Sequence, residues 1–195
     1  MSVEDLFPDW PRPPYEGFTA EDLFRLPDLP PHTQMIDGSF VFRSRQSRFH
    51  SVTNGLLETG LSRAAPAHLD VVREMVVVLG RRQAPEPDVA VIRAGGDRGP
   101  SVDRYYARDV VLAVETVSPD SEERDCGRKP QLYAEAGIEH FWRVEMDGSD
   151  DRPVVYVHER DQVTGVYELT GVHRVRLRLT VPFGIDIDLT EIDRL

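Results

Sequence analysis

The hydrophobic residues of this chain change their spacing along the sequence. Between positions 47 and 61 they recur at helical intervals, which predicts an amphipathic helix. These residues are Phe49, Val52, Leu56 and Leu57. From position 74 onward the hydrophobic residues form short runs rich in β-branched side chains, which predict strands over 74–79, 87–92 and 109–115. The last run is almost entirely apolar, as expected of a strand buried on both faces of a sheet.

The second half of the chain contains both kinds of spacing. A helical stretch is expected from residue 119 to about residue 136, and Gly137 follows it in the position that favours a C-terminal cap. Four strand-like segments come after it, over 141–145, 153–157, 165–169 and 172–181. This order of helix, central strands, helix and further strands predicts an α/β fold.

The N-terminal part of the chain has its own local signals. Residues 1–17 are expected to form a proline-rich arm, which Phe7 and Trp10 anchor on the surface unless the arm remains an unpacked tail. Thr19 predicts the start of a short helix over 19–24, with Asp22 at the reciprocal capping position. The Asp37-Gly38 pair predicts a hairpin over 35–42. From its length, we expect the rest of the chain, residues 18–195, to form one domain.

Composition limits the class of protein. The chain has 40% hydrophobic and 29% charged residues, which is ordinary for a globular protein. Its first residues are acidic and precede no apolar run, so no export signal is expected, and no segment approaches the roughly 20 apolar residues of a membrane span. The single cysteine, Cys126, has no internal partner for a disulfide, which favours a reducing compartment. We therefore expect a cytoplasmic protein.

The charge balance bears on possible partners. The formal net charge is −11, from 34 acidic and 23 basic residues. Affinity for nucleic acid comes largely from phosphates neutralised by lysine and arginine, so this balance disfavours a protein whose main task is to hold nucleic acid. It remains compatible with a nuclease, because sites for divalent cations are built from carboxylates and a local basic face can serve the substrate.

Two carboxylates stand at unusual places in the predicted sheet. Asp88 lies at the start of one strand, and Glu115 closes the apolar strand. An unpaired carboxylate is costly to bury, so Glu115 requires a partner, and a cation shared with a carboxylate on an adjacent strand is one solution. Asp125 and Lys129 are four residues apart on the predicted helix and share a face. They form either an ordinary surface pair or, if that face meets the sheet edge, a group that places Lys129 beside the two carboxylates.

Each of these residues also has an ordinary structural explanation. A Pro-Asp pair is usually a turn, so Asp88 alone is weak evidence. Glu115 can be paired in a salt bridge or exposed at the end of its strand, and a lone lysine such as Lys129 is usually solvated. Taken together, in this order and on these elements, the three residues are a more specific signal than any one of them.

The segments that carry these residues resemble a known family. They are Pro87-Asp88-Val89-Ala90-Val91, Val114-Glu115-Thr116-Val117-Ser118-Pro119, and residues 124–138 with Phe141-Trp142. They are similar to a large bacterial family of restriction-endonuclease-like proteins, the Uma2-type branch of the PD-(D/E)XK nuclease superfamily. The resemblance runs from about residue 18 to the C-terminus and is most specific over 115–142. It implies a central mixed β-sheet flanked by helices, with an N-terminal extension and extra C-terminal strands.

The resemblance also implies roles for single residues. Asp88 and Glu115 would bind a divalent metal, Mg²⁺ or Mn²⁺. The superfamily often has a lysine two positions after the glutamate, where this chain has a valine, so Lys129 on the following helix is the expected replacement. Tyr133, one turn further along, would face the same side. The family often has an acidic residue before the Ile-Asp-Gly turn, and Gln34 stands there instead, which implies weaker metal binding or an inactive protein.

The activity implied by the resemblance is metal-dependent hydrolysis of phosphodiester bonds in DNA. Lys129 would steady the attacking water or the charge that grows on the phosphate. A homodimer is expected, because many nucleases of this superfamily dimerise to cut both strands. Two other functions stay open. One is a non-catalytic relative that binds a partner or nucleic acid, which Gln34 and the net charge favour; the other is a metal-dependent phosphoesterase with a small substrate, which the charge suits.

Two groups of arginines are further candidates for contacts with phosphates. The first consists of Arg43, Arg45 and Arg48, beside His50. The second consists of Arg174, Arg176 and Arg178, which alternate with apolar residues and would share one face of a strand. For the second group, a solvated polar face is the favoured explanation, whereas the first group lies closer to the site that the resemblance implies.

Overall fold

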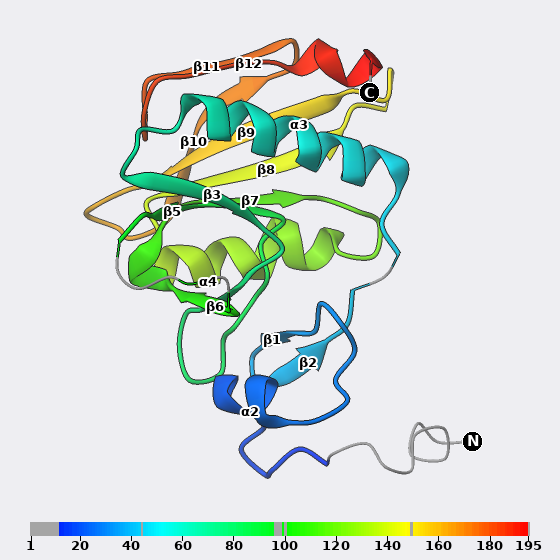
Figure 1. Cartoon of the computed structure of the whole chain (residues 1–195), viewed down its shortest axis with the longest axis vertical. Coiled ribbons are helices and arrows are strands. Elements are labelled where there is room, and N and C mark those ends of the chain that lie inside the picture. The colour runs from blue at the N-terminus through cyan, green and yellow to red at the C-terminus, as the bar shows by residue number, and fades with distance from the viewer. Residues whose placement is uncertain (1–11, 44, 96–98, 100, 149, 195) are drawn as a thin grey trace.

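A six-stranded mixed sheet forms the centre of the molecule (Figure 1). The computed structural model describes residues 12–43, 45–95, 99, 101–148 and 150–194, so the predicted arm lies outside the described residues up to residue 11. The strands of the sheet are β3 (Leu69–Arg73), β5 (Val89–Arg93), β7 (Val110–Thr116), β8 (His140–Met146), β9 (Pro153–Arg160) and β10 (Tyr167–His173). Their order is β10-β9-β8-β7-β5-β3, in which β7 and β8 are parallel and the other neighbours antiparallel.

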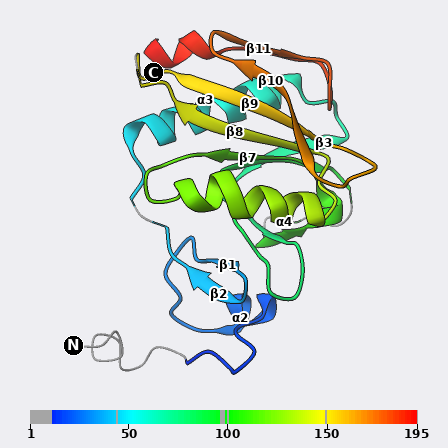
Figure 2. The same ribbon diagram turned by 180° about the vertical axis from the view of Figure 1, so that it is seen from behind.

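Helices cover the two faces of this sheet. The helix α3 (Arg48–Ala64) lies on one face and α4 (Lys129–Glu135) on the other, as the two opposite views show (Figures 1 and 2). Side chains of β5 alternate between the two interfaces: Val89 and Val91 pack in the core beneath α3, and Ala90 and Ile92 in the core that includes Tyr133 of α4. A strand buried on both faces explains the continuous apolar run of β5, and β7 is buried along its whole length in the same way.

The helix predicted from position 47 is confirmed as α3. The Ser47 side chain accepts a hydrogen bond of 3.2 Å from the backbone N–H of His50, which caps the first turn. Leu57 and Leu61 are fully buried against the sheet. The helix ends at Ala64, slightly later than its spacing predicts and shortly before Pro66.

A small N-terminal layer lies below the main sheet in Figure 1. It consists of α2 (Ala20–Arg25), β1 (Gln34–Ile36) and β2 (Ser39–Val41), next to the parallel pair β4 (Val76–Val78) and β6 (Arg104–Tyr106). The predicted cap of α2 is present, with the Thr19 backbone N–H donating to the Asp22 carboxylate at 2.7 Å. The predicted hairpin is also present, since Asp37 and Gly38 have φ values of 53° and 76°, which suit a tight turn.

The N-terminal layer is joined to the segment that precedes β5 by backbone hydrogen bonds and hydrophobic packing. Met35 of β1 exchanges two backbone hydrogen bonds of 2.9 Å with Ala84. Phe18, Ala20 and Leu23 bury their side chains with Met35 and Ala84 in a separate hydrophobic cluster. This attachment brings Gln34, at the start of β1, beside the residues that lead into Asp88.

The C-terminal part adds a second hairpin and a short helix next to α3. These are β11 (Arg176–Leu179), β12 (Ile185–Asp188) and the 3-10 segment η3 (Leu189–Arg194); another 3-10 turn, η1 (Ala107–Asp109), precedes β7. Leu177, Ile185 and Ile187 join the core beneath α3. The prediction of one strand over 172–181 is wrong, because residues 172 and 173 complete β10 and the chain then bends before β11.

Several elements differ in number or length from those predicted by the sequence. The strands β3, β6 and β12 were not predicted, and the strand predicted over 74–79 is reduced to β4 because Glu74 has a φ of 52°. The helix expected from residue 119 starts later, since the backbone N–H of Ser118 donates to the Ser121 hydroxyl in a local turn. Before α4 this helix contains a π-helical segment, η2 (Arg124–Arg128).

The end of this helix agrees with the prediction. Gly137 has a φ of 83° and ends α4. Within the described ranges, none of the helices has the length and apolar character needed to span a membrane.

Candidate active site

Asp88 lies just before β5 and is held in place by the neighbouring strand. Its backbone N–H donates to the carbonyl of Val114 at 3.0 Å, and its carboxylate Oδ2 accepts a hydrogen bond of 2.7 Å from the backbone N–H of Thr116. The residue is 1% exposed. Burial alone would raise the pKa of this carboxyl, but the hydrogen bond from His50 and the charge of Arg43 lower the pKa below its ordinary value. Asp88 is therefore a fixed, ionised carboxylate at the sheet edge.

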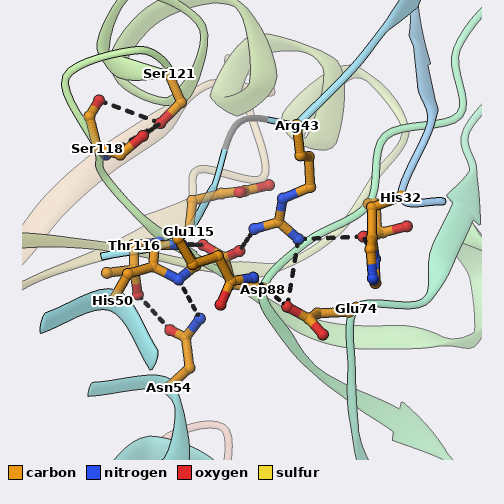
Figure 3. Close-up of polar contacts among 12 residues, drawn as sticks. His32, Arg43, His50, Asn54, Glu74, Asp88, Glu115, Thr116, Ser118 and Ser121 are labelled. Atoms are coloured by element: carbon orange, nitrogen blue, oxygen red, sulfur yellow. Dashed lines mark hydrogen bonds and ion pairs between the residues drawn. The ribbon is translucent and has the colours of Figure 1, made fainter. Parts of the chain in front are cut away.

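A closed ring of hydrogen bonds supports Asp88 from α3 (Figure 3). His50 Nε2 lies 3.2 Å from Asp88 Oδ2, and His50 Nδ1 lies 3.1 Å from the Asn54 amide nitrogen. Asn54 Oδ1 accepts a hydrogen bond of 2.6 Å from the Thr116 hydroxyl. Because the Asn54 amide nitrogen can only donate, His50 Nδ1 accepts and Nε2 carries the hydrogen that points at Asp88. The sequence did not decide whether His50 has a structural role or belongs to the site. In the structure it contacts the predicted site residue Asp88.

Glu115 lies inside β7 and receives two hydrogen bonds from α4. Lys129 Nζ donates to its Oε2 at 2.8 Å and the Tyr133 hydroxyl donates to its Oε1 at 2.6 Å. The pKa of Glu115 is raised to about 8, mainly by burial; the charge of Lys129 lowers it, and the charges of Asp125 and Asp88 raise it. Burial also raises the pKa of the Tyr133 hydroxyl well above its ordinary value, so that this hydroxyl remains a donor.

The pair of Asp125 and Lys129 is a buried feature, which corrects the surface pair considered from the sequence. Asp125 is 2% exposed and Lys129 is 3% exposed, and their charged groups are 3.1 Å apart. They meet because the face of the helix that carries them packs against β7. Burial alone would lower the pKa of Lys129, but the carboxylates of Glu115 and Asp125 raise it, so the ammonium keeps its charge. Asp125 Oδ1, the oxygen that faces Lys129, is buried, and its contact with Lys129 is an ion pair without hydrogen-bond geometry.

Gln34 and Glu86 lie on the opposite side of the same site. Gln34 is 3% exposed, and its Oε1 accepts a hydrogen bond of 3.3 Å from the backbone N–H of Glu86. Glu86 is 4% exposed, and its carboxylate contacts His32 at 2.8 Å and Arg43 at 3.1 Å. Glu86 was not predicted from the sequence. Its position two residues before Asp88 could have indicated a place in the site, because side chains at that spacing lie on the same side of an extended chain.

These residues surround a small cavity. Its volume is about 40 Å³, and its lining includes Gln34, Arg43, Asp88, Glu115 and Lys129. That volume is space for about three water molecules, which is enough for a cation with part of its water shell. Of the five predicted site residues, four therefore line one cavity, and the fifth, Tyr133, donates its hydroxyl to Glu115 behind it.

The donor set of the cavity suits a hard divalent cation. Three buried carboxylates line it, those of Asp88, Glu115 and Asp125, and its largely buried cations are Arg43 and Lys129; Arg45 and Arg124 line it from more exposed positions. Among these buried groups carboxylates outnumber cations, which favours an additional positive charge. No three His, Cys, Asp or Glu side chains among the described residues are grouped closely enough to form a complete metal cage. Two carboxylates, completed by water and a substrate phosphate, are a usual arrangement for Mg²⁺.

The other candidates from the sequence lie elsewhere. Of the first arginine group, Arg43 and Arg45 line the cavity. In the second group, Arg176 and Arg178 both pair with Asp186 on β12, and Arg174, outside β11, pairs with Asp147. The expectation that these three arginines share one strand face is therefore wrong, because the chain bends after β10.

Comparison with known proteins identifies the family. A family model described as "Uma2: Putative restriction endonuclease" matches residues 20–190. The chain belongs to the Uma2 family. This membership confirms the resemblance inferred from the sequence, and it supports a restriction-endonuclease-like nuclease in general terms. A search of curated proteins found no match.

A solved structure shows the same fold. The chain is similar to a protein from Anabaena variabilis described as a putative nuclease belonging to DUF820, with a TM-score of 0.68 and 14% sequence identity. The likeness covers 90% of this chain and 97% of that chain. At this identity it establishes the fold alone, which agrees with the expected α/β architecture of a central mixed sheet flanked by helices.

Proposed function

We propose that this Uma2 protein is a metal-dependent endonuclease that hydrolyses phosphodiester bonds in DNA. The observation that carries the proposal is the convergence of Asp88, Glu115 and Lys129 on one small cavity in which buried carboxylates outnumber buried cations. Maintaining such an imbalance of charge inside a protein destabilises the fold, so a function is the better explanation for it than stability. Membership of the Uma2 family supports the same conclusion at the level of a nuclease.

In this proposal Asp88 and Glu115 hold Mg²⁺ or Mn²⁺. A divalent cation bound there would polarise the scissile phosphate and lower the pKa of a bound water. Thr116 and His50 keep the Asp88 carboxylate in one orientation through their hydrogen bonds to Oδ2. Tyr133 does the same for Glu115 through its Oε1. These supports act as preorganisation, since the carboxylates do not have to be ordered when the substrate binds.

Lys129 is the proposed source of electrostatic stabilisation. Its ammonium is buried, stays charged, and lines the cavity between Glu115 and Asp125. A cation in this place stabilises negative charge that grows on the phosphate and orients the attacking water. It takes this role from the helix, while the position two residues after Glu115 is the valine Val117.

Two alternatives have their own supporting observations. Gln34, where the family often has an acidic residue, and the net charge of −11 favour a catalytically inactive or weakened relative that acts as a binding module. The same charge and the small cavity favour a metal-dependent phosphoesterase with a small substrate. The homodimer expected from the resemblance belongs to the nuclease proposal, because two copies of one site are needed to cut both strands at once.

A cleavage assay separates these functions. Supercoiled plasmid and single-stranded DNA are incubated with Mg²⁺ or Mn²⁺ and with wild type, Glu115→Gln or Lys129→Met; Arg176→Gln, on the distant hairpin, is the matched control. The nuclease proposal predicts metal-dependent cleavage by wild type and the control, and loss of cleavage in both site variants. A folded wild type that binds neither metal and cuts neither DNA contradicts the proposal and favours the binding module. Metal binding without DNA cleavage, combined with hydrolysis of a small phosphodiester, favours the phosphoesterase.

A further inference from the structure

Arg43 occupies the centre of a group of carboxylates at the cavity (Figure 3). It follows β2 on the connection to α3, and its side chain is only 16% exposed. Its guanidinium donates to Asp88 Oδ1 and to Glu86 Oε1 at 3.1 Å, and it lies 3.7 Å from Glu74 Oε1. One built-in cation is thus shared by three carboxylates, one of which is the proposed metal ligand Asp88.

The two oxygens of Asp88 differ in what they can still bind. Oδ2 accepts hydrogen bonds from the Thr116 backbone and from His50, which use both of its lone pairs. Oδ1 has Arg43 as its partner. A metal that binds directly to Asp88 therefore binds Oδ1, beside the guanidinium that already uses one of its two lone pairs. Two cations on one carboxylate oxygen repel each other strongly in a buried site.

We propose that Arg43 and the divalent cation compete for Asp88 Oδ1, and that metal binding transfers Arg43 to Glu86 and Glu74. This inference rests on the proposed function and adds a regulatory step to its metal site. The geometry offers a place for the displaced side chain, because Glu86 and Glu74 already contact the same guanidinium. After the transfer, Arg43 still faces the cavity, where it would contact a substrate phosphate. Without metal, it neutralises Asp88 and limits the repulsion among the buried carboxylates.

Metal affinity tests the competition without any measurement of cleavage. Mn²⁺ is titrated calorimetrically into wild type, Arg43→Ala and Arg45→Ala. Arg45 is the matched control because it lines the same cavity but is exposed and, within the described ranges, has no ion pair with a carboxylate. Removal of Arg43 is expected to tighten Mn²⁺ binding by about tenfold or more, the factor that corresponds to one charge-assisted hydrogen bond. Removal of Arg45 is expected to change the affinity by less than about threefold, because only a screened, more distant charge is lost.

A second measurement follows Arg43 in the intact protein, which keeps the test decisive if Arg43→Ala fails to fold. The Nε–H resonance of Arg43 is assigned by its loss in Arg43→Lys and is followed during a titration with Mg²⁺. Competition predicts a shift of this resonance with the same midpoint as metal binding. An unmoved resonance during saturable metal binding overturns the inference.

The remaining outcomes separate this inference from the proposed function. If Mn²⁺ binds wild type and Arg43→Ala equally well, or binds the variant more weakly, the competition is wrong while the metal site stands. If Mn²⁺ binds neither protein, both the competition and the metal-dependent function are contradicted. Tighter binding in Arg45→Ala of the same size as in Arg43→Ala also overturns the inference, because general charge would then explain the effect.

Discussion

Two clusters of paired basic and acidic side chains in this molecule differ in their exposure to solvent and in their distance from the cavity. One lies between β7 and α4, where Lys129 contacts Glu115 and Asp125 with side chains that are at most 4% exposed. The other lies on the hairpin of β11 and β12, where Arg176 and Arg178 pair with Asp186. The Arg176 and Asp186 side chains are 50% and 44% exposed. From the sequence, Lys129 was expected to act at the substrate phosphate through the family resemblance, and Arg176 and Arg178 were considered for phosphate contacts.

The difference indicates which cluster has a function. In an exposed ion pair each charge replaces water contacts with contacts to its partner, and the free energy of folding changes little. The presence of such a pair therefore does not indicate a function. A buried cluster loses the hydration of each charge, and hydrophobic residues in its place would often give a more stable protein. A buried cluster of this kind beside a cavity is better explained by a function than by stability. The buried cluster is therefore the centre of the proposed active site, and the hairpin cluster is a solvated surface.

The largest expected effect is on the stability of the protein when one cation is removed from each cluster. Lys129→Ala leaves Glu115 and Asp125 in the interior without their cation, and we expect it to lower the free energy of unfolding by about 3–5 kcal/mol. Arg176→Ala removes an exposed partner of Asp186, and we expect no clear change because water replaces the contact. Urea unfolding at pH 7 measures both. Equal effects of the two substitutions would contradict the comparison.

A smaller effect is expected at the hydroxyl that orients Glu115. Tyr133→Phe removes the hydrogen bond of 2.6 Å to Glu115 Oε1 while retaining the ring in the core, and we expect the cleavage rate to fall by about tenfold. Tyr167→Phe is the matched control, because the Tyr167 hydroxyl donates to the Ile138 carbonyl at 2.8 Å, outside the cavity. Single-turnover rates check both. A loss of activity in the control as large as in Tyr133→Phe would show that the effect is not specific to the site.

The sequence predicted the parts of the fold that depend on nearby residues. They are the cap at Thr19, the Asp37-Gly38 turn, the amphipathic helix α3 and the apolar runs of β5 and β7, each of which arises from contacts within a few residues or from simple burial. The strand β12 was missed, because its Ile-Asp-Ile-Asp pattern is short and its pairing with β11 depends on a reversal of the chain. The bend after β10, which separates Arg174 from Arg176, has no local signal either.

The site itself was only partly accessible from the sequence. Asp88, Glu115 and Lys129 were found through strand ends, helical spacing and the family resemblance. The contacts of Arg43 with Asp88 and Glu86 join residues more than forty positions apart, and no periodic pattern encodes them. The burial of Asp125 depends on how the helix that carries it packs against β7. Long-range packing thus decides which of several ordinary charged residues belong to the site.

The smallest expected effect concerns a charge pair that is intermediate between the two clusters. Arg128, next to Lys129, donates two hydrogen bonds of 2.6 and 2.9 Å to Asp37 in the hairpin turn, and the Asp37 side chain is 52% exposed. The hydrogen bonds from Arg128 lower the pKa of Asp37 to about 2. A lowered pKa in the folded state stabilises the protein above the ordinary aspartate pKa, and this contribution is lost as the pH falls toward 2.

Asp37→Asn tests this pair. After allowance for solvent screening, we expect the substitution to cost about 0.5 kcal/mol at pH 6, with the difference from wild type shrinking below about pH 4. Urea unfolding between pH 6 and pH 3 measures it. A difference that stays constant, or grows, as the pH falls would mean that the Asp37 charge is not the cause.

The most direct test of the account compares single-turnover cleavage of supercoiled plasmid in Mg²⁺ by wild type and by Asp88→Asn. The substitution keeps the shape of the side chain but removes the charge that Thr116, His50 and Arg43 surround. We predict that wild type cleaves in a metal-dependent way and that Asp88→Asn, with folding verified by circular dichroism, falls to the rate of the metal-free control. Cleavage by Asp88→Asn at the rate of wild type would contradict the assignment of the active site to this cavity.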